Sequence, residues 1–386
     1  MSYSGQYYLV SIMRVCISLV GICLFSCVEK KEEVKLVDHS EVEKEIEVTK
    51  AQVFNKLVVV DSLGVTGADG AISFLLTNGT SVFMMGDSFL KPVVDGKRDP
   101  KSKMINNTFI VVDKKNNRST SIFKGTLNDP ETMLLPKNNK GTKEYYWPGH
   151  GFEFNGELHI FMSRFKHISN DTWGFKYTGV DYLKLDKETF SIISQEDFPY
   201  ALKNGVHYGH SIINEQDYTY IYGSKQVDDG ATLHVARGVV DEATNTLTGY
   251  EFFNGKDWVK TPEESEQLKG IDKQVPEQFT VFKYSNKYIL IMQERDLTSG
   301  NIYSYVSDLP TGPWKNKTFL YHTTEQETSK KDKLFTYNAM AHPQFIENDR
   351  LLVSYCTNSF LVPTIHENVD YYRPKFLWVP MKKILN

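Results

Sequence analysis

The sequence predicts an all-β protein folded as a five-bladed β-propeller with about four strands per blade. From about residue 55 the chain shows short alternating apolar runs between turn residues, with no sustained helical periodicity. One hairpin pattern recurs five times, and further strand-like segments follow each copy. With 40% hydrophobic and 24% charged residues, the composition fits a globular protein with a sizeable core.

The repeated hairpins set the number of blades. They span residues 68–87, 148–162, 208–223, 277–294 and 341–355. Third strands are expected at residues 109–113, 180–185, 233–237, 302–306 and 375–379. About four strands in each of five units is typical of a propeller. A pair of β-sandwiches does not explain a fivefold repeat, and a β-helix would have a far shorter one.

The N-terminal segment, residues 1–26, is predicted to be a secretory signal peptide. A short positive region at 13–14 precedes an apolar run at 15–25, which is too short to span a bilayer as a stable helix. Residues 24–27, Leu-Phe-Ser-Cys, resemble a bacterial lipoprotein box. That resemblance implies that Cys27 is lipidated and becomes the mature N-terminus.

Residues 27–50 are predicted to be a flexible tether, and residues 51–386 the propeller domain. The tether is too charged to form a core. Its acidic start resembles the export signal of surface lipoproteins in Bacteroidetes-type bacteria. We therefore expect a protein of the cell envelope, held at the outer membrane or cell surface only by its lipid. Cys356, the single cysteine of the expected mature domain, lies in a buried-strand pattern and is predicted to be a packed thiol.

The five predicted first strands open with polar residues. These are Asp69, His150, His210, Glu277 with Gln278, and His342. First strands line the channel of a propeller, so these side chains should converge, and core positions are normally apolar. The pattern therefore predicts a polar ligand pocket.

Hairpin register predicts pairs within this pocket. A turn at Asn78-Gly79 places Asp69 near Asp87 on the second strand. Two close carboxylates repel, which favours keeping one protonated. The same construction places Glu277 beside Glu294, His210 beside Tyr222, and Asn338 beside Asn358. Two structural alternatives stay open: Asp87 as a loop cap, and Glu294 as the partner of a cation.

Paired carboxyl groups indicate glycoside hydrolysis, in which one protonates the leaving oxygen and the other acts as nucleophile or activates water. The predicted catalytic residues are Asp69, Asp87 and Glu277. The predicted substrate-binding residues are Trp147, His150, His210, Tyr222, Arg237, Gln278, Glu294, Asn338, His342 and Asn358. The expected partner is a polysaccharide or oligosaccharide, and the protein is expected to be a monomer.

Other functions find no support in the sequence. A net charge of −4 gives no basic surface for nucleic acid. Phosphate-loop, dinucleotide, zinc-protease and serine-hydrolase motifs are absent. We assign no metal site and no required cofactor, because His150, His210 and His342 lack a local ligand motif; a cation such as calcium in the channel stays open as an alternative.

Short segments across residues 60–380 resemble glycoside hydrolase family 183, formerly a domain of unknown function. They are residues 68–73, 86–89, 106–108, 147–149, 220–223, 235–237, 312–314 and 341–343. The resemblance implies a five-bladed propeller with endo-D-arabinanase-like activity, whose essential carboxylates fall on Asp69 and Asp87. Here Ser88 replaces the family's usual Thr, and His150 stands where an acid is expected, which leaves any third carboxylate open.

The favoured function is therefore a surface-anchored hydrolase of arabinofuranosyl-type or related polysaccharide linkages. A non-catalytic glycan-binding propeller lipoprotein is the main alternative, and it predicts binding without turnover. A propeller that docks another protein is a third, and it predicts a large exposed apolar patch with no polar cluster in the channel.

Overall fold

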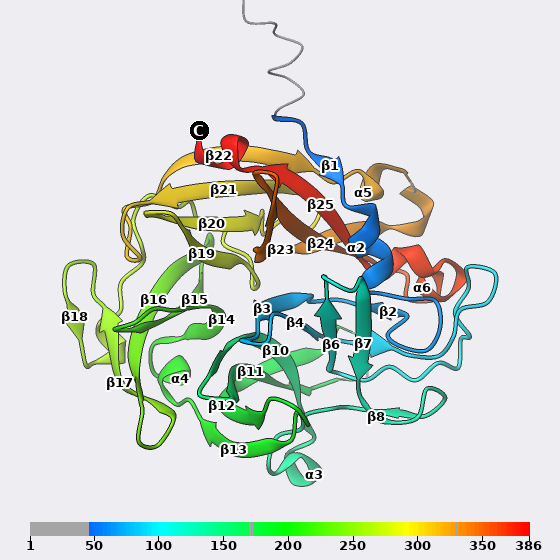
Figure 1. Ribbon diagram of the computed structural model, residues 1–386, viewed down its shortest axis with the longest axis horizontal. Coiled ribbons are helices and arrows are strands. Elements are labelled where there is room, and N and C mark those ends of the chain that lie inside the picture. The colour runs from blue at the N-terminus through cyan, green and yellow to red at the C-terminus, as the bar shows by residue number, and fades with distance from the viewer. Residues whose placement is uncertain (1–45, 170, 172, 329) are drawn as a thin grey trace, which may run out of the picture.

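The computed structural model describes residues 46–386 apart from 170, 172 and 329, and confirms the five-bladed β-propeller (Figure 1). The predicted signal peptide, the lipidated Cys27 and most of the predicted tether lie outside the described residues. Among the residues that are described, no helix is long and apolar enough to cross a membrane.

Each blade is an antiparallel sheet whose first strand lies at the axis. Blade 1 holds β3 (Ile72–Leu75), β4 (Ser81–Met85), β6 (Thr108–Asp113) and β7 (Arg118–Ile122). Blade 2 holds β10 (Glu144–Phe154), β11 (Glu157–His167), β12 (Phe175–Asp186) and β13 (Ile192–Asp197). Blade 3 holds β14 (Val206–Asn214), β15 (Thr219–Val227), β16 (Gly230–Asp241), β17 (Thr246–Phe253) and β18 (Trp258–Val259).

Blade 4 holds β19 (Thr280–Tyr284), β20 (Lys287–Gln293), β21 (Asn301–Ser307) and β22 (Lys315–His322). Blade 5 holds β23 (Leu334–Glu347), β24 (Arg350–Ser359), β25 (Pro374–Pro380) and β1 (Thr49–Lys50). Two short ribbons pair β2 (Gly67–Ala68) with β5 (Ser88–Phe89), and β8 (Lys124–Gly125) with β9 (Pro130–Glu131). The helices are short: α2 (Gln52–Leu57), α3 (Asn139–Thr142), α4 (Tyr200–Asn204), α5 (Glu325–Thr328), α6 (Thr364–Glu367) and α7 (Met381–Leu385), with 3₁₀ turns at Pro262–Glu264, Lys330–Asp332 and Val369–Tyr371.

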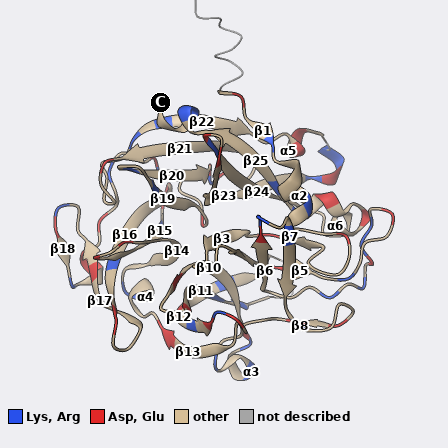
Figure 2. Cartoon of the chain, viewed as in Figure 1, with Lys and Arg blue, Asp and Glu red and all other residues tan. Residues whose placement is uncertain are grey.

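The ring closes because the first strands contact one another in the order β3, β10, β14, β19, β23 and back to β3. A hydrophobic cluster fills the space between each pair of neighbouring blades. Inner strands are therefore buried on both faces, as in β4, where every residue is buried. Charged residues gather on the outer strands and loops (Figure 2).

Polar side chains link the first strands across the axis. The Ser73 hydroxyl is hydrogen-bonded to His342 Nδ1 at 2.6 Å, and His150 Nε2 to the Ser73 carbonyl at 3.2 Å. Ser211 Oγ accepts from the Val281 amide at 2.8 Å, and Thr280 Oγ1 from the Ala341 amide at 3.0 Å. Among the described residues, hydrogen-bonded side chains therefore fill the middle of the propeller, where an open channel was expected.

The N-terminal strand completes the last blade. Thr49 pairs with Trp378 and Lys50 with Leu377, so β1 forms the outer strand beside β25. These two residues lie at the end of the predicted tether, and their backbone supplies the fourth strand of the blade. Helix α2 follows at once and buries Phe54 against Phe345, with ring centroids 4.9 Å apart.

We predict that Phe54→Ala destabilises the propeller by about 3–5 kcal/mol, because it leaves a cavity in the core between the first and last blades. Val53→Ala on the same helix is the control: Val53 is 53% exposed, and its truncation should change the free energy of unfolding by less than about 0.5 kcal/mol. Urea denaturation of both variants and the parent measures the difference. Equal midpoints for the two variants would show that α2 does not hold the ring closed.

Candidate active site

One cavity receives side chains from all five blades. Its volume is about 710 Å³, and its walls include Asp69 and Asp87 of blade 1, Trp147 of blade 2, His210 of blade 3 and Glu277 before blade 4. Tyr337 and Asn358 of blade 5 complete it. A second cavity of about 510 Å³ surrounds Arg164 and Asp181 on blade 2 and shares no lining residue with the first.

Local backbone geometry places Asp69 and Asp87 together. Ala68 pairs with Ser88, and the Gly86 amide donates a hydrogen bond to the Asp69 carbonyl at 2.9 Å. The Asp69 carboxylate lies against Gly86: a Cβ at that position would lie 2.2 Å from Asp69 Oδ1. A side chain at position 86 would therefore displace the Asp69 carboxylate from its present place.

The two carboxylates have different hydrogen-bond partners. Asp87 Oδ1 accepts from Trp147 Nε1 at 2.9 Å and from Asn106 Nδ2 at 3.1 Å. Asp69 Oδ2 accepts from the Tyr337 hydroxyl at 2.8 Å, and Tyr372 donates to the Asp87 carbonyl at 3.0 Å. Two N–H donors on one oxygen favour the ionised form of Asp87.

Both carboxyl groups bind protons more strongly than ordinary aspartates. Burial raises the pKa of Asp69 to about 7, and the neighbouring charge of Asp87 adds to the increase. Burial also raises the pKa of Asp87 to about 6, against the lowering effect of Trp147 and Asn106. The two acids titrate as a pair, and near neutral pH the pair holds about one proton, chiefly on Asp69.

Glu277 has a different environment. Its Oε2 lies 3.5 Å from His207 Nδ1 and 3.9 Å from His210 Nε2, and its Oε1 lies 3.0 Å from Arg295 Nη1. Burial alone would raise the pKa of Glu277, but the hydrogen bond with His207 and the neighbouring charge of Arg295 lower it well below its usual range. Glu277 is therefore an anion paired with Arg295 and not a proton donor.

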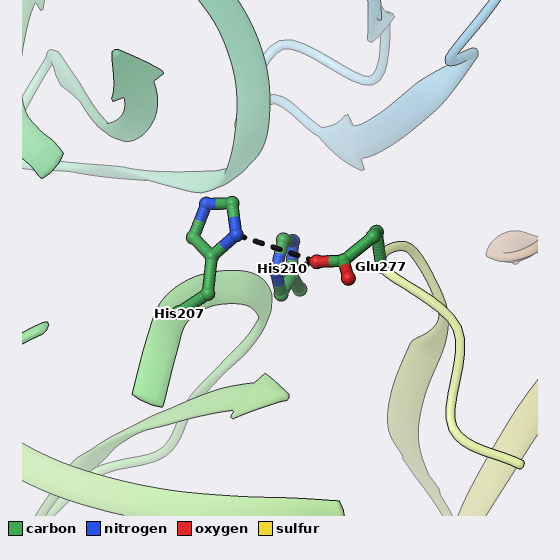
Figure 3. A group of neighbouring side chains, drawn as sticks. All are labelled: His207, His210 and Glu277. Carbon is green, nitrogen blue, oxygen red and sulfur yellow. Dashed lines mark ion pairs between the residues drawn. The ribbon is translucent and has the colours of Figure 1, made fainter. Parts of the chain in front are cut away.

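This cluster is the one group among the described residues that could hold a metal ion: the ligand atoms of His207, His210 and Glu277 all lie within 4.8 Å of one another (Figure 3). Burial lowers the pKa of His210 well below its usual range, so its ring is neutral. His207 was not among the predicted site residues.

Aromatic rings form one wall of the cavity. The Trp147 ring lies 4.5 Å from Phe165 and 4.9 Å from Phe175, centroid to centroid. Trp173, 43% exposed, reaches across to Phe335 of blade 5 at 6.1 Å. Such a wall offers apolar faces beside the two acids.

The cavity collects nine of the predicted site residues. They are Asp69, Asp87, Trp147, His210, Glu277, Gln278, Glu294, Asn338 and Asn358. Glu294 accepts hydrogen bonds from Ser299 Oγ at 2.6 Å and from Asn301 Nδ2 at 3.2 Å, and its Oε1 lies 3.7 Å from Lys317 Nζ.

The other four predicted residues do not line the cavity. His150 and His342 are buried at the axis, where they are hydrogen-bonded within the first strands. Tyr222 is fully buried and donates to the Pro310 carbonyl at 2.8 Å. Arg237 is paired with Glu251 and covered by Tyr218 and Trp258 on the outer part of blade 3.

β-Bulges shift the register of two predicted pairs, and this is why alternation along the strands does not identify every cavity residue. Ser211, not His210, is opposite Tyr222, after a bulge between Tyr208 and Ser211. In blade 5, Asn358 is opposite Phe335, because a bulge follows Tyr337. Asn106 belonged to a segment already singled out, residues 106–108, and this was the available signal for it. Tyr337 and Tyr372 had no such signal.

We predict that Asp69→Asn raises the thermal stability of the protein at pH 8. The folded state holds a proton on Asp69 up to about pH 7, whereas an unfolded carboxyl releases it near pH 4, so stability falls as pH rises through this window. The amide removes that loss, and the Tm should rise by at least about 2 °C at pH 8, with a smaller gain at pH 5.

The matched control is Asp228→Asn at an exposed position, which should leave the Tm unchanged at both pH values. A gain for Asp69→Asn that is equal at pH 5 and pH 8, or absent at both, would contradict the raised pKa.

Comparison with known proteins identifies the family of this chain and structures with a similar fold. No curated protein matches it. The fold is similar to that of a candidate hydrolase from Bacteroides ovatus ATCC 8483, with a TM-score of 0.71 at 18% identity over 86% of this chain and 90% of the other. Weaker similarities are to the GH43_1 enzyme from Xanthomonas citri (TM-score 0.48, 12% identity, 88% and 92% covered) and to an exo-1,5-α-L-arabinanase from a bovine ruminal metagenomic library (0.45, 10%, 82% and 93%). Residues 51–381 match the family model described as Domain of unknown function (DUF5005), and the chain therefore belongs to that family.

Proposed function

We propose that this protein is a glycoside hydrolase that cleaves arabinofuranosyl-type linkages, as in D-arabinan-like polysaccharides. The observation that carries the proposal is the pair of adjacent carboxyl groups, Asp69 and Asp87, which face one open cavity and share about one proton near neutral pH. Glycoside hydrolysis needs this division between an acid and an ionised carboxylate.

In the proposed reaction Asp69 gives its proton to the glycosidic oxygen as the bond from that oxygen to the anomeric carbon breaks. Asp87, kept ionised by Trp147 and Asn106, stabilises the positive charge that develops on the sugar, as nucleophile or as base for water. Water supplies the hydroxyl that ends on the anomeric carbon, and its second proton returns to the carboxyl pair.

The cavity walls suit a carbohydrate. Trp147 and Trp173 present ring faces on which a sugar can stack, while Gln278, Asn338 and Asn358 bring amide groups to the same cavity. The arabinofuranosyl class comes from the resemblance to glycoside hydrolase family 183 at residues 68–73 and 86–89. A lipid anchor at Cys27 would hold this monomeric enzyme on the outer membrane or cell surface, where polysaccharides arrive.

The first test is product release from a panel of polysaccharides that includes D-arabinan and L-arabinan. We expect oligosaccharides from the parent protein, and a loss of about 10²- to 10⁴-fold or more in kcat for Asp69→Asn and for Asp87→Asn, since each removes a group that acts in the transition state. Asp228→Asn should be as active as the parent.

Retained activity in both single variants would refute the assignment. Binding of one glycan without release of any product, by the parent as well as by the variants, would favour the glycan-binding alternative instead.

The pH dependence of kcat/KM gives a separate prediction. Activity needs Asp69 protonated, so it should fall as pH rises above about 7, and it needs Asp87 ionised, so it should also fall below about pH 6. The expected profile is a bell with its maximum between these values. A flat profile from pH 4 to pH 9 would contradict the proposed division of roles.

A further inference from the structure

We propose that His207, His210 and Glu277 form a binding site for a divalent transition-metal ion of the zinc class, within the same cavity as the two aspartates. The site goes beyond the proposed hydrolysis and does not depend on it. These three ligands could not be recognised as a set from the sequence. His207 and His210 lie on one bulged strand, β14, whereas Glu277 lies in the loop before β19.

The oxygen of Glu277 lies near the spacing from both histidines that such an ion requires, and small side-chain movements would bring the three ligand atoms to it. At Zn–N and Zn–O distances of about 2.1 Å, tetrahedral ligand atoms lie about 3.4 Å apart. Glu277 Oε2 lies 3.5 Å from His207 Nδ1 and 3.9 Å from His210 Nε2, and all three atoms lie within 4.8 Å of one another. Figure 3 shows His207 and Glu277 pointing toward one another, with the ring of His210 beside the line that joins them.

An unsatisfied nitrogen points to a missing ligand. His210 is only 3% exposed, and its Nε2 has no hydrogen-bond partner among the described residues. A buried polar atom without a partner costs about 1–3 kcal/mol. A metal ion at the centre of the cluster would satisfy it.

Neighbouring groups orient the other two ligands. Ser163 Oγ lies 2.6 Å from His207 Nε2, and in the tautomer in which Nε2–H donates to this hydroxyl, Nδ1 carries the lone pair that an ion needs. Arg295 holds Glu277 Oε1 at 3.0 Å, so Oε2 is turned to the histidines. Second contacts of this kind fix the tautomer and direction of ligands in metal sites.

The donor set selects the ion. Two imidazole nitrogens and one carboxylate suit zinc and similar transition metals, whereas calcium prefers six to eight oxygen ligands. The calcium alternative left open by the sequence therefore does not fit this cluster. Because all three ligands line the cavity, the fourth position would face the bound substrate or water.

The test is a titration of the chelator-treated protein with ZnSO₄ by calorimetry, and with CoCl₂ by visible absorption. We expect one ion per chain. His207→Gln and Glu277→Gln should weaken binding about 100-fold or more, and Ser163→Ala, which removes only the orienting hydroxyl, about 10-fold or more. Zinc should also raise the Tm of the parent protein, and not that of the two ligand variants.

Two controls separate this site from other effects. His322→Gln removes the histidine of a surface pair, His322 Nε2 and Glu327 Oε1 at 2.8 Å, and should bind zinc as the parent does. Asp69→Asn should lose hydrolysis but keep the ion, so failure of the proposed function and failure of the metal site give different results.

The proposal is overturned if the parent binds neither ion at millimolar concentration, or if Glu277→Gln binds as tightly as the parent. If a ligand variant does not fold, the affinity of Ser163→Ala decides: a value equal to that of the parent overturns the site.

Discussion

The close packing of the five first strands around the axis is the constraint on which the rest of the structure depends. At the contact of β10 with β14 there is no room for a side chain: a Cβ on Gly149 would lie 2.5 Å from the Gly209 carbonyl oxygen, and one on Gly209 would lie 2.6 Å from Phe161 Cβ. Gly209 also has a φ of +97°, a backbone conformation that favours glycine. The strands approach so closely that the axis is filled by hydrogen-bonded side chains, and the open cavity forms where the strands begin.

Bulges in three of these first strands shape the cavity. Registers shift within β10 between Pro148 and Gly151, within β14 between Tyr208 and Ser211, and within β23 after Tyr337. A bulge re-aims the side chains on one side of it, so residues before and after it no longer follow simple alternation. His207, His210 and Tyr337 reach the cavity in this way, whereas His150 and His342 turn to the axis.

The contrast between regular and bulged strands explains which parts of the structure could be predicted from the sequence. The fivefold hairpin repeat identified the fold, because turn residues and alternation repeat with the blades. The pairing of Asp69 with Asp87 was also accessible, since blade 1 has a short hairpin closed by Asn78-Gly79 and no bulge in β3 or β4. In blades 2, 3 and 5 the bulged register could not be read from alternation, and neither could the closure of blade 5 by Thr49 and Lys50, which depends on a contact between the two ends of the described chain.

The cavity holds acids in two opposite electrostatic states. Asp69 and Asp87 lie close together, and no basic side chain in the described part of the chain is hydrogen-bonded to either, so burial and repulsion keep a proton on the pair. Glu277 has Arg295 and two histidines around it and stays ionised. Since a carboxylate paired with Arg295 cannot deliver a proton at neutral pH, the proposed reaction assigns proton transfer to the aspartates. The proposed role of Glu277 is to bind a metal ion together with His207 and His210, whose imidazole nitrogens lie near the same carboxylate oxygen.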